Sequence, residues 1–228
     1  MSKFYCTFIL LIIFPFVANS QTHPFKYEHI TEQNGLSHSC ISCIIQDSKG
    51  FIWIGTENGL NKYDRYTMKE YIHEPGNPHS LSSNFIRALY QQPVDSGKVL
   101  WIGTIGGGLN KFDLELEKFT IYRHVPDDLT SLSHNDVQCI YKDRAGTMWI
   151  GTEGGGLNGF DRETGKFISY RHDSNDSNSI SDNWIYAICE DQYGDLWLGH
   201  SRYGGLTKFD RQKGIFYHYN PTTTLNVI

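Results

Sequence analysis

Four sets of residues have types and spacings that could do chemistry. The segment WIGTEGGGLNGFD, at residues 149–161, has three consecutive glycines after an apolar run, as in a loop that cradles phosphate. Cys40 and Cys43 form a Cys-x-x-Cys pair, which in an exported chain suggests a redox pair or half of a metal site. Histidines and aspartates also recur along the chain, and these residue types could serve as metal ligands or acid–base groups.

The glycine loop is better explained as scaffold, because it recurs. Four similar segments begin at tryptophans that are each 48 residues apart: Trp53, Trp101, Trp149 and Trp197. A fixed interval of this kind indicates a repeated structural unit rather than one nucleotide site. A phosphate loop also needs Gly-Lys-Ser/Thr and a following helix, whereas Leu-Asn or Leu-Thr follows here. We expect the glycines to form the turn between two strands.

The repeat register also explains the cysteines. One position of the repeat holds Cys43, Ala88, Cys139 and Ala187. This pattern predicts a small buried slot, where a free cysteine behaves as a small hydrophobic residue. A disulfide among Cys40, Cys43, Cys139 and Cys189 remains open, because the sequence does not pair them.

The histidines and aspartates fall once per repeat. His73, His124, His172 and His218 lie at or near the end of the fourth strand-like piece. Residues spread in this way are more often solvated strand ends than ligands of one ion. Asp64, Asp113, Asp161 and Asp210 end the third piece, where a turn favours aspartate for backbone hydrogen bonds. We therefore expect no catalytic residues, no metal and no cofactor.

Each repeat contains four strand-like pieces. An apolar run leads through an Asp-x-x-Gly turn, replaced in the second repeat by a longer loop, to the tryptophan segment. The Leu-Asn-x-Phe/Tyr-Asp piece follows, and then an aromatic alternating piece such as KFISYRH. Four antiparallel strands in about 48 residues is the size of one propeller blade. The fold class is thus an all-β propeller with four blades of four strands, in which the tryptophans are expected to pack between blades. The four repeats are expected at about residues 35–75, 80–124, 131–172 and 179–220.

The two ends of the chain suggest export and an incomplete ring. Residues 1–20 have the features of a cleavable signal peptide, which predicts a periplasmic chain with no membrane contact after cleavage. Within residues 21–34, the segment 25–31 is interpreted as a strand that would complete the last blade. Residues 221–228 are interpreted as the start of a truncated fifth repeat. Open blades would expose apolar faces, so the remaining blades or a second copy are the expected partners.

The repeat pattern Ile-x-x-Ile-x-x-Asp-x-x-Gly-x-x-Trp-Ile-Gly-Thr-x-x-Gly-Gly-Leu-x-x-Phe-Asp resembles the two-component regulator propeller repeat. The resemblance covers about residues 35–220. It implies the N-terminal part of a periplasmic sensor region of Bacteroidetes hybrid two-component kinases, many of which detect oligosaccharides. It also implies seven-bladed rings, of which four blades are visible here, with kinase, receiver and DNA-binding modules to follow.

The resemblance and the residues favour a non-enzymatic ligand-sensing module that lacks those later modules. The alternatives are a propeller enzyme, such as a lyase or glycan hydrolase, or an inert degraded paralogue. A split sensor is a further interpretation of the incomplete ring. Nucleic acid is a poor candidate partner, because the net charge is −5 and no basic cluster is present.

A recognition site should lie where the repeats differ. Trp184 is the one tryptophan of five outside the 48-residue register, on the loop that leads into a first strand. Cys40, Phe85 and Asp136 hold the matching places in the other repeats. The ligand-binding candidates are Trp184, Glu57, Glu153, His200, Arg202 and Tyr203. An aromatic face beside the channel could stack on a sugar ring, or Trp184 could instead plug the channel.

Overall fold

The computed structural model describes residues 27–91, 97–201 and 204–219. Its sixteen strands form four separate sheets of four antiparallel strands, each in the order in which the strands follow along the chain. Apart from these strands, the described part contains one short 3-10 helix, η1 (Glu32–Asn34). The all-β fold with four four-stranded units, as predicted from the repeat, is confirmed.

Each sheet corresponds to one repeat and is called a blade below. Blade 1 contains β1 (Ile41–Gln46), β2 (Ile52–Thr56), β3 (Gly59–Tyr63) and β4 (Met68–Tyr71). Blade 2 contains β5 (Ile86–Gln91), β6 (Val99–Thr104), β7 (Gly108–Asp113) and β8 (Lys118–Tyr122). Blade 3 contains β9 (Val137–Lys142), β10 (Met148–Thr152), β11 (Leu157–Phe160) and β12 (Phe167–Tyr170). Blade 4 contains β13 (Ile185–Glu190), β14 (Leu196–His200), β15 (Leu206–Asp210) and β16 (Ile215–Tyr219).

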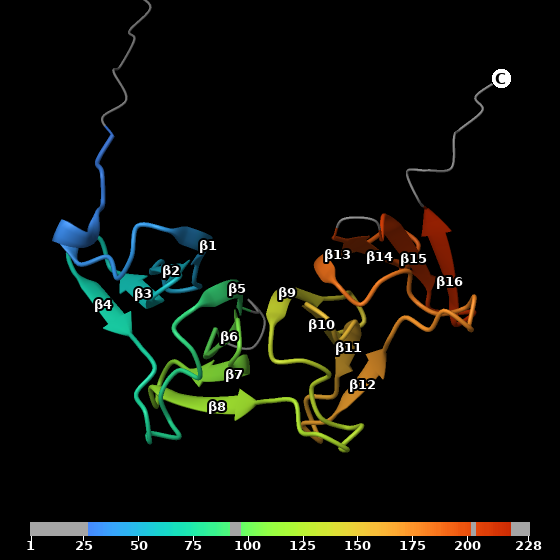
Figure 1. The fold of residues 1–228 in the computed structure, drawn as a ribbon. Coiled ribbons are helices and arrows are strands. Elements are labelled where there is room, and N and C mark those ends of the chain that lie inside the picture. Colours follow the sequence, from blue (N-terminus) through green and yellow to red (C-terminus); the bar gives the residue numbers. More distant parts are fainter. Residues whose placement is uncertain (1–26, 92–96, 202–203, 220–228) are drawn as a thin grey trace, which may run out of the picture.

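The blades follow one another along an open arc (Figure 1). The first strands β1, β5, β9 and β13 line the inner side of the arc, and each of the first three contacts the first strand of the next blade. The fourth strands β4, β8, β12 and β16 lie on the outer side. The arc is open between blade 1 and blade 4, at the top of the view. The inner rim is therefore the place where one strand from every blade meets.

In three blades an aspartate in the first turn holds the tryptophan of the second strand. Trp53 Nε1 donates to Asp47 Oδ2 at 2.9 Å, and the other carboxylate oxygen accepts the backbone N–H groups of Lys49 and Phe51. Trp149 and Trp197 make the equivalent bonds to Asp143 and Asp191 at 2.8 and 2.9 Å. The constant six-residue spacing from aspartate to tryptophan is the sequence sign of this contact.

Each of the first three tryptophans packs edge-on against a phenylalanine of the next blade. The ring centroids of Trp53 and Phe112 are 5.9 Å apart, and those of Trp101 and Phe160 are 5.4 Å apart. In blade 3 the corresponding pair is Trp149 with Phe209, at 6.2 Å. All three tryptophans are almost fully buried. The apolar core of the molecule thus lies between blades rather than inside any one of them.

The glycine of each tryptophan segment lets the next blade approach closely. A Cβ placed on Gly55 would lie 2.6 Å from the side chain of Ile86, and one on Gly103 would lie 2.6 Å from that of Val137. A Cβ on Gly151 would lie 2.8 Å from the side chain of Ile185. Real Cβ atoms do not come this close, so each glycine forms a notch that a β-branched residue of the following blade fills.

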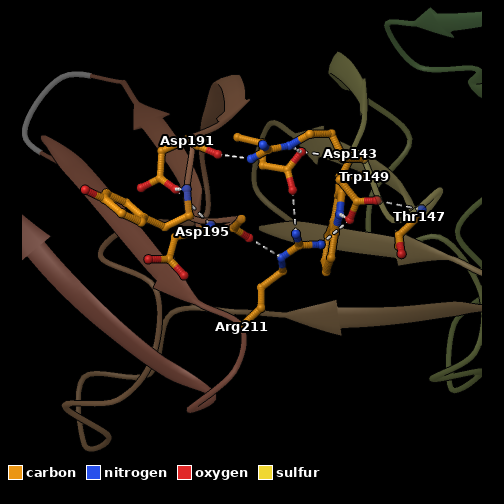
Figure 2. Close-up of polar contacts among 10 residues, drawn as sticks. Asp143, Thr147, Trp149, Asp191, Asp195 and Arg211 are labelled. Carbon is orange, nitrogen blue, oxygen red and sulfur yellow. Dashed lines mark hydrogen bonds and ion pairs between the residues drawn. The ribbon is translucent and has the colours of Figure 1, made fainter.

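An ion-pair network joins blades 3 and 4 (Figure 2). Arg211, which follows β15, pairs with the carboxylate of Asp143 in the first turn of blade 3. Its other terminal nitrogen pairs with Glu190 of β13 at 2.7 Å. The second oxygen of Glu190 accepts from the backbone and the side chain of Arg144 at 2.9 and 3.0 Å. Burial raises the pKa of Glu190, but the hydrogen bonds from Arg144 outweigh this and hold that pKa below its usual value.

The strand expected at residues 25–31 does not form over its described part. Residues 27–31 pair with no strand, and Thr31 instead caps the short helix η1. A strand exists only beside a neighbouring strand edge, and the edge proposed for this segment belongs to a blade other than the four described. The expected signal peptide at residues 1–20 and the expected fifth-repeat start at 221–228 lie outside the described residues. Within the described ranges, no helix is long and apolar enough to span a bilayer.

The notch contact predicts that two equivalent glycines respond differently to alanine. In Gly103→Ala the new Cβ lies 2.6 Å from the side chain of Val137 in the next blade, so we expect the free energy of unfolding to fall by about 1–3 kcal/mol. In Gly199→Ala the new Cβ lies 3.4 Å from Ala187 of its own strand pair, an ordinary contact, so we expect little change. Urea unfolding at low chain concentration measures both, and equal losses would contradict the notch.

Candidate functional site

The first strand of every blade carries a β-bulge at the same place. In blade 2, Ile86 pairs with Thr104 and Ala88 pairs with Gly103, so Arg87 has no partner in the ladder. The same skip occurs in the other three blades, at Ser42, Gln138 and Tyr186. A bulge bends its strand and redirects the extra side chain. Four side chains of different chemistry are thereby placed at one level of the inner rim.

Two loops of each blade meet beside this bulge. The backbone N–H just after the second strand donates to the carbonyl of the residue just before the first strand. The pairs are Glu57 with Cys40, Ile105 with Phe85, Glu153 with Asp136, and Ser201 with Trp184, at 2.9–3.2 Å. These are the two loops that the sequence places together around the channel. Each blade therefore presents three variable positions side by side: before the first strand, at the bulge and after the second strand.

A hollow of about 210 Å³ lies among these positions on blades 2, 3 and 4. It is lined by Phe85, Arg87, Ile105, Gln138, Glu153 and Tyr186. Arg87 Nε donates to Gln138 Oε1 at 2.8 Å, and Gln138 Nε2 donates in turn to Glu153 Oε2. This chain of polar groups crosses from blade 2 to blade 3. The hollow thus combines aromatic walls with an ordered set of planar donors and acceptors.

The tyrosine of the hollow stays a neutral hydroxyl near neutral pH. Partial burial and the nearby Glu153 carboxylate both raise the pKa of Tyr186. Its O–H therefore remains able to donate and to accept. Together with the Arg87 guanidinium and the Gln138 amide, this gives the hollow several groups that can bind hydroxyls on a ligand.

The structure brings some of the sequence candidates together and separates others. Glu153 lines the hollow, and Trp184 forms an antiparallel bridge with it on the neighbouring loop. The Trp184 indole is half-buried beside Gly154 and does not line the hollow. Glu57 belongs to blade 1, where its carboxylate accepts from Cys40 Sγ at 3.1 Å. The candidates Arg202 and Tyr203 lie outside the described residues.

Three segments of the chain match a protein-family model described as two component regulator propeller, at residues 35–58, 131–154 and 179–202. These segments run from the start of a repeat through its second strand. These three segments of the chain therefore match two component regulator propeller repeats.

Solved structures place these propeller repeats among sensor domains. The extracellular domain of the hybrid two component system BT3049 from B. thetaiotaomicron is 29% identical with a TM-score of 0.75, over 84% of this chain and 26% of that one. The extracellular domain of the one component system BT4673 from the same organism, 24% identical over 79% of this chain and 22% of that one, has the same fold with a TM-score of 0.62.

A curated relative is similar over a shorter stretch. Histidine kinase P4 of Formosa agariphila is 40% identical over 75 residues, which is 32% of this chain and 6% of that protein. The chain thus spans about a quarter or less of the length of each of these proteins. The family model and the BT3049 domain both connect these propeller repeats with two-component systems.

Sequence reasoning missed Arg87, Gln138 and Tyr186 in this propeller. These residues follow the β-branched position that starts each first strand in all four repeats, which makes them look like ordinary outward strand residues. Their signal is that one position holds Ser42, Arg87, Gln138 and Tyr186 while its neighbours hardly vary. A position that varies in chemistry inside a constant strand is a candidate for recognition. Phe85 holds the place that matches Trp184, but its place alone did not predict a binding role.

His200 has a place inside blade 4 that differs from the one expected for a binding residue. It occupies the position of Thr56, Thr104 and Thr152 in the other propeller repeats. Its Nε2 lies 2.9 Å from Thr207 Oγ1, while its Nδ1 is buried with no hydrogen-bond partner among the described residues. Burial lowers the pKa of His200 to about 4, so the ring is neutral at pH 7.

The repeated histidines hold the linkers between blades. Nδ1 of His73, His124 and His172 lies 2.7–3.0 Å from the carbonyl oxygen of Leu81, Leu132 and Ile180, respectively. They are therefore hydrogen-bonded scaffold groups rather than merely solvated strand ends. His218 was grouped with them, but it lies one residue before Tyr219, whereas His73 lies two residues after the matching Tyr71.

The cysteines and the repeated aspartates also have local partners. Cys40, Cys43, Cys139 and Cys189 are all free thiols. Burial raises the pKa of Cys139 to about 12, so this thiol is a poor nucleophile and packs as a small apolar group. Asp64 accepts the backbone N–H groups of Tyr66 and Thr67 across its turn, and these bonds lower its pKa.

The burial of neutral His200 predicts a pH-dependent loss of stability. The unfolded chain protonates this residue below pH 6.5, whereas the folded chain keeps it neutral down to about pH 4. Stability present above pH 6.5 is thus lost as the pH falls, and the loss is complete below about pH 4. Between about pH 7.5 and about pH 4.5, we expect the native chain to lose about 2 kcal/mol more free energy of unfolding than His200→Thr.

His200→Thr is the matched variant because threonine occupies this position in the three other blades. Urea unfolding of both chains at the two pH values measures the difference. An equal loss in both chains would contradict burial of the neutral imidazole, since acid effects on all other groups are common to the pair.

Proposed function

We propose that this chain is an exported ligand-sensing propeller of a two-component system and that it binds an oligosaccharide at the inner rim. The observation that carries the proposal is the set of four bulges, which place Ser42, Arg87, Gln138 and Tyr186 at one level of an otherwise repeated scaffold. A scaffold alone needs no such variation. The extracellular sensor domains to which the chain is similar support both the export and the sensing role.

The chemistry of the hollow suits a sugar. Phe85 and Tyr186 offer aromatic surface on which a pyranose ring can pack. The groups of Arg87, Gln138 and Glu153 are the planar donors and acceptors that hydroxyls need, and their mutual bonds fix them before the ligand arrives. A volume of about 210 Å³ is below the ~300–1,000 Å³ of typical drug-sized sites. We infer that it holds one ring of a longer ligand.

The residues that line the hollow favour ligand recognition over glycoside hydrolysis. Glycoside hydrolysis commonly uses two carboxylates on either side of the bond. Glu153 is the only carboxylate among the residues that line the hollow. It is also already engaged by Gln138.

The position of the hollow gives a route from binding to signalling. Its lining comes from three blades, so a ligand that contacts all of them stabilises one relative arrangement of those blades. A sensor responds only if the ligand binds two arrangements with unequal affinity. The inter-blade location meets that requirement more directly than a site within a single blade would.

A binding screen with variants of the bulge residues tests this proposal. We expect one or more members of an oligosaccharide panel to bind the purified chain in calorimetry. We expect Gln138→Ala to weaken that binding at least tenfold, because it removes the link between Arg87 and Glu153. Gln192→Ala, an exposed glutamine of blade 4, is the matched control and should bind as the native chain does.

Trp184→Ala distinguishes recognition from plugging. Loss of sugar binding at an unchanged melting temperature would assign the Trp184 indole to the ligand site. Equal loss of binding and of melting temperature would assign it to the channel plug. Failure of every oligosaccharide to bind, or binding that Gln138→Ala does not alter, would overturn the oligosaccharide site at the hollow.

A further inference from the structure

In three of the four blades, a lysine lies opposite the repeat tryptophan. The cross-strand pairs are Trp53 with Lys62, Trp101 with Lys111, and Trp197 with Lys208. Directly opposite residues of an antiparallel pair lie on the same face of the sheet, so each lysine stem begins beside the indole. In blade 3 the residue opposite Trp149 is Gly159. Blade 3 therefore lacks a side chain that the same face of the other three blades carries.

Two of these lysines show where the ammonium group lies. Lys62 Nζ is 5.5 Å from the ring centroid of its tryptophan and 4.0 Å from that of Phe51. Lys208 Nζ is 5.9 Å from the ring centroid of its tryptophan and pairs with Asp195 at 2.7 Å. Phe51 and Asp195 hold the same place, two residues before the tryptophan. The ammonium thus lies between the indole and the side chain at that place, within the range of a cation–π contact.

Blade 3 has a pocket of about 410 Å³ where this lysine would stand. Trp149, Gly159 and Ile168, which are successive cross-strand neighbours, form part of its lining. Thr147, two residues before the tryptophan, adds a hydroxyl at the place just described. The volume lies within the ~300–1,000 Å³ of typical small-molecule sites.

The pocket is separate from the hollow at the inner rim. It lies between the turn that joins β9 to β10 and the turn that joins β11 to β12. In an antiparallel sheet these turns are at the opposite end from the β10–β11 loop, which carries Glu153 of the hollow. A ligand of this pocket is therefore independent of the oligosaccharide proposed above.

A carboxylate of the pocket lacks the partner that its counterpart has in blade 2. Glu163 lines the pocket, and the residue at its place in blade 2 is Glu115, which pairs with Lys98 at 3.1 Å. The place of Lys98, three residues before the tryptophan, is held in blade 3 by Gly146, which also lines the pocket. The Glu163 carboxylate has no hydrogen bond or ion pair within residues 27–91, 97–201 and 204–219. Glycine thus stands at both places from which a lysine brings an ammonium group in another blade.

The other charged groups of the lining are already engaged. Asp161 accepts the Thr164 hydroxyl at 2.6 Å and the backbone N–H of Glu163 at 2.9 Å, and these bonds lower its pKa. Asp161 is therefore ionised at neutral pH. Arg162 also lines the pocket and already has an interaction partner. The pocket consequently offers a negative turn, an indole and one carboxylate that is available to a ligand.

We propose that this pocket of blade 3 binds a primary alkylammonium group, held between the Trp149 indole and the Glu163 carboxylate with its alkyl stem against Ile168. An ammonium has three N–H donors, for which the Glu163 carboxylate and the Thr147 hydroxyl are acceptors. The ligand takes the place of the lysine that the other three blades supply from their own third strand.

A titration with n-butylammonium chloride tests this site, because that ion has the carbon chain and the charge of a lysine side chain. We expect it to move the Trp149 indole N–H signal of the purified chain saturably in NMR spectra at constant ionic strength. Butan-1-ol has the same chain without the charge, and it should cause no saturable shift.

Two substitutions of Gly159 separate the ammonium from the stem position. Gly159→Lys supplies the group from the chain itself and should weaken n-butylammonium binding about tenfold. Gly159→Ala is the control, because it adds the Cβ alone, which would lie 3.2 Å from the Trp149 ring. It should retain most of the binding, and a loss equal to that of Gly159→Lys would contradict the proposed place of the ammonium.

A second pair of variants probes the carboxylate on the surface, where the fold is not at risk. Glu163→Gln should weaken n-butylammonium binding about threefold, the effect of a solvent-exposed ion pair. Glu115→Gln is the matched control at the same place in blade 2, where Lys98 is the partner, and it should bind as the native chain does.

The outcomes decide both the site and the source of the group. Saturable binding that Gly159→Lys and Glu163→Gln both weaken supports the proposal. No saturable shift at Trp149, equal binding of butan-1-ol, or binding that neither variant changes overturns it. Pentane-1,5-diamine and Nα-acetyl-lysine amide then distinguish a free amine from a lysine of a partner protein, because the ligand of the matching class should bind more tightly.

Discussion

The contact between a glycine and a β-branched residue of the next blade is the constraint on which the rest of the structure depends. At Gly55, Gly103 and Gly151 the following blade comes closer than any residue with a Cβ would allow. That approach sets the separation of the first strands along the inner rim. It also lets the tryptophan two residues earlier in the same strand reach the phenylalanine of the next blade. Because a blade has no core of its own, the spacing between blades decides the burial of nearly every large side chain.

The same contact explains where recognition becomes possible. The β-branched residue is fixed in its notch, and the ladder resumes one residue later than regular pairing would allow, so the residue between them is expelled as a bulge. Its side chain takes no part in the notch contact, so its residue type can vary. Ser42, Arg87, Gln138 and Tyr186 are the result. The packing between blades thus requires a β-branched residue at the notch position but allows the bulge position after it to vary. Three of the variable bulge residues, Arg87, Gln138 and Tyr186, line the hollow.

The contrast between repeated scaffold positions and variable bulge positions also explains which features could be predicted from the sequence. The strands, the turns and the inter-blade tryptophans follow from a 48-residue period, because each repeats four times. The β-bulge could not be predicted in this way, because it depends on the register of strand pairing and has no characteristic turn residue in the sequence. Trp184 attracted attention as an unusual residue type, yet Arg87 and Gln138 form the polar link across the hollow. The burial of His200 was equally hidden, because only its equivalence with three buried threonines shows that it points inward.

Polar contacts between blades distinguish one joint from another, which the apolar contacts cannot do because they are nearly the same at every joint. The notch and the tryptophan are nearly identical at every joint, so by themselves they would accept any blade as the next one. The joints differ in their charged groups: Lys69 pairs with Glu117 between blades 1 and 2, whereas Arg211 pairs with Asp143, and Arg144 with Glu190, between blades 3 and 4. The Asp143 carboxylate is fully buried, and a buried charge without its partner is strongly unfavourable. A neighbour without Arg211 would leave Asp143 in that state, so this ion pair favours the native joint while the glycine notch allows the close approach.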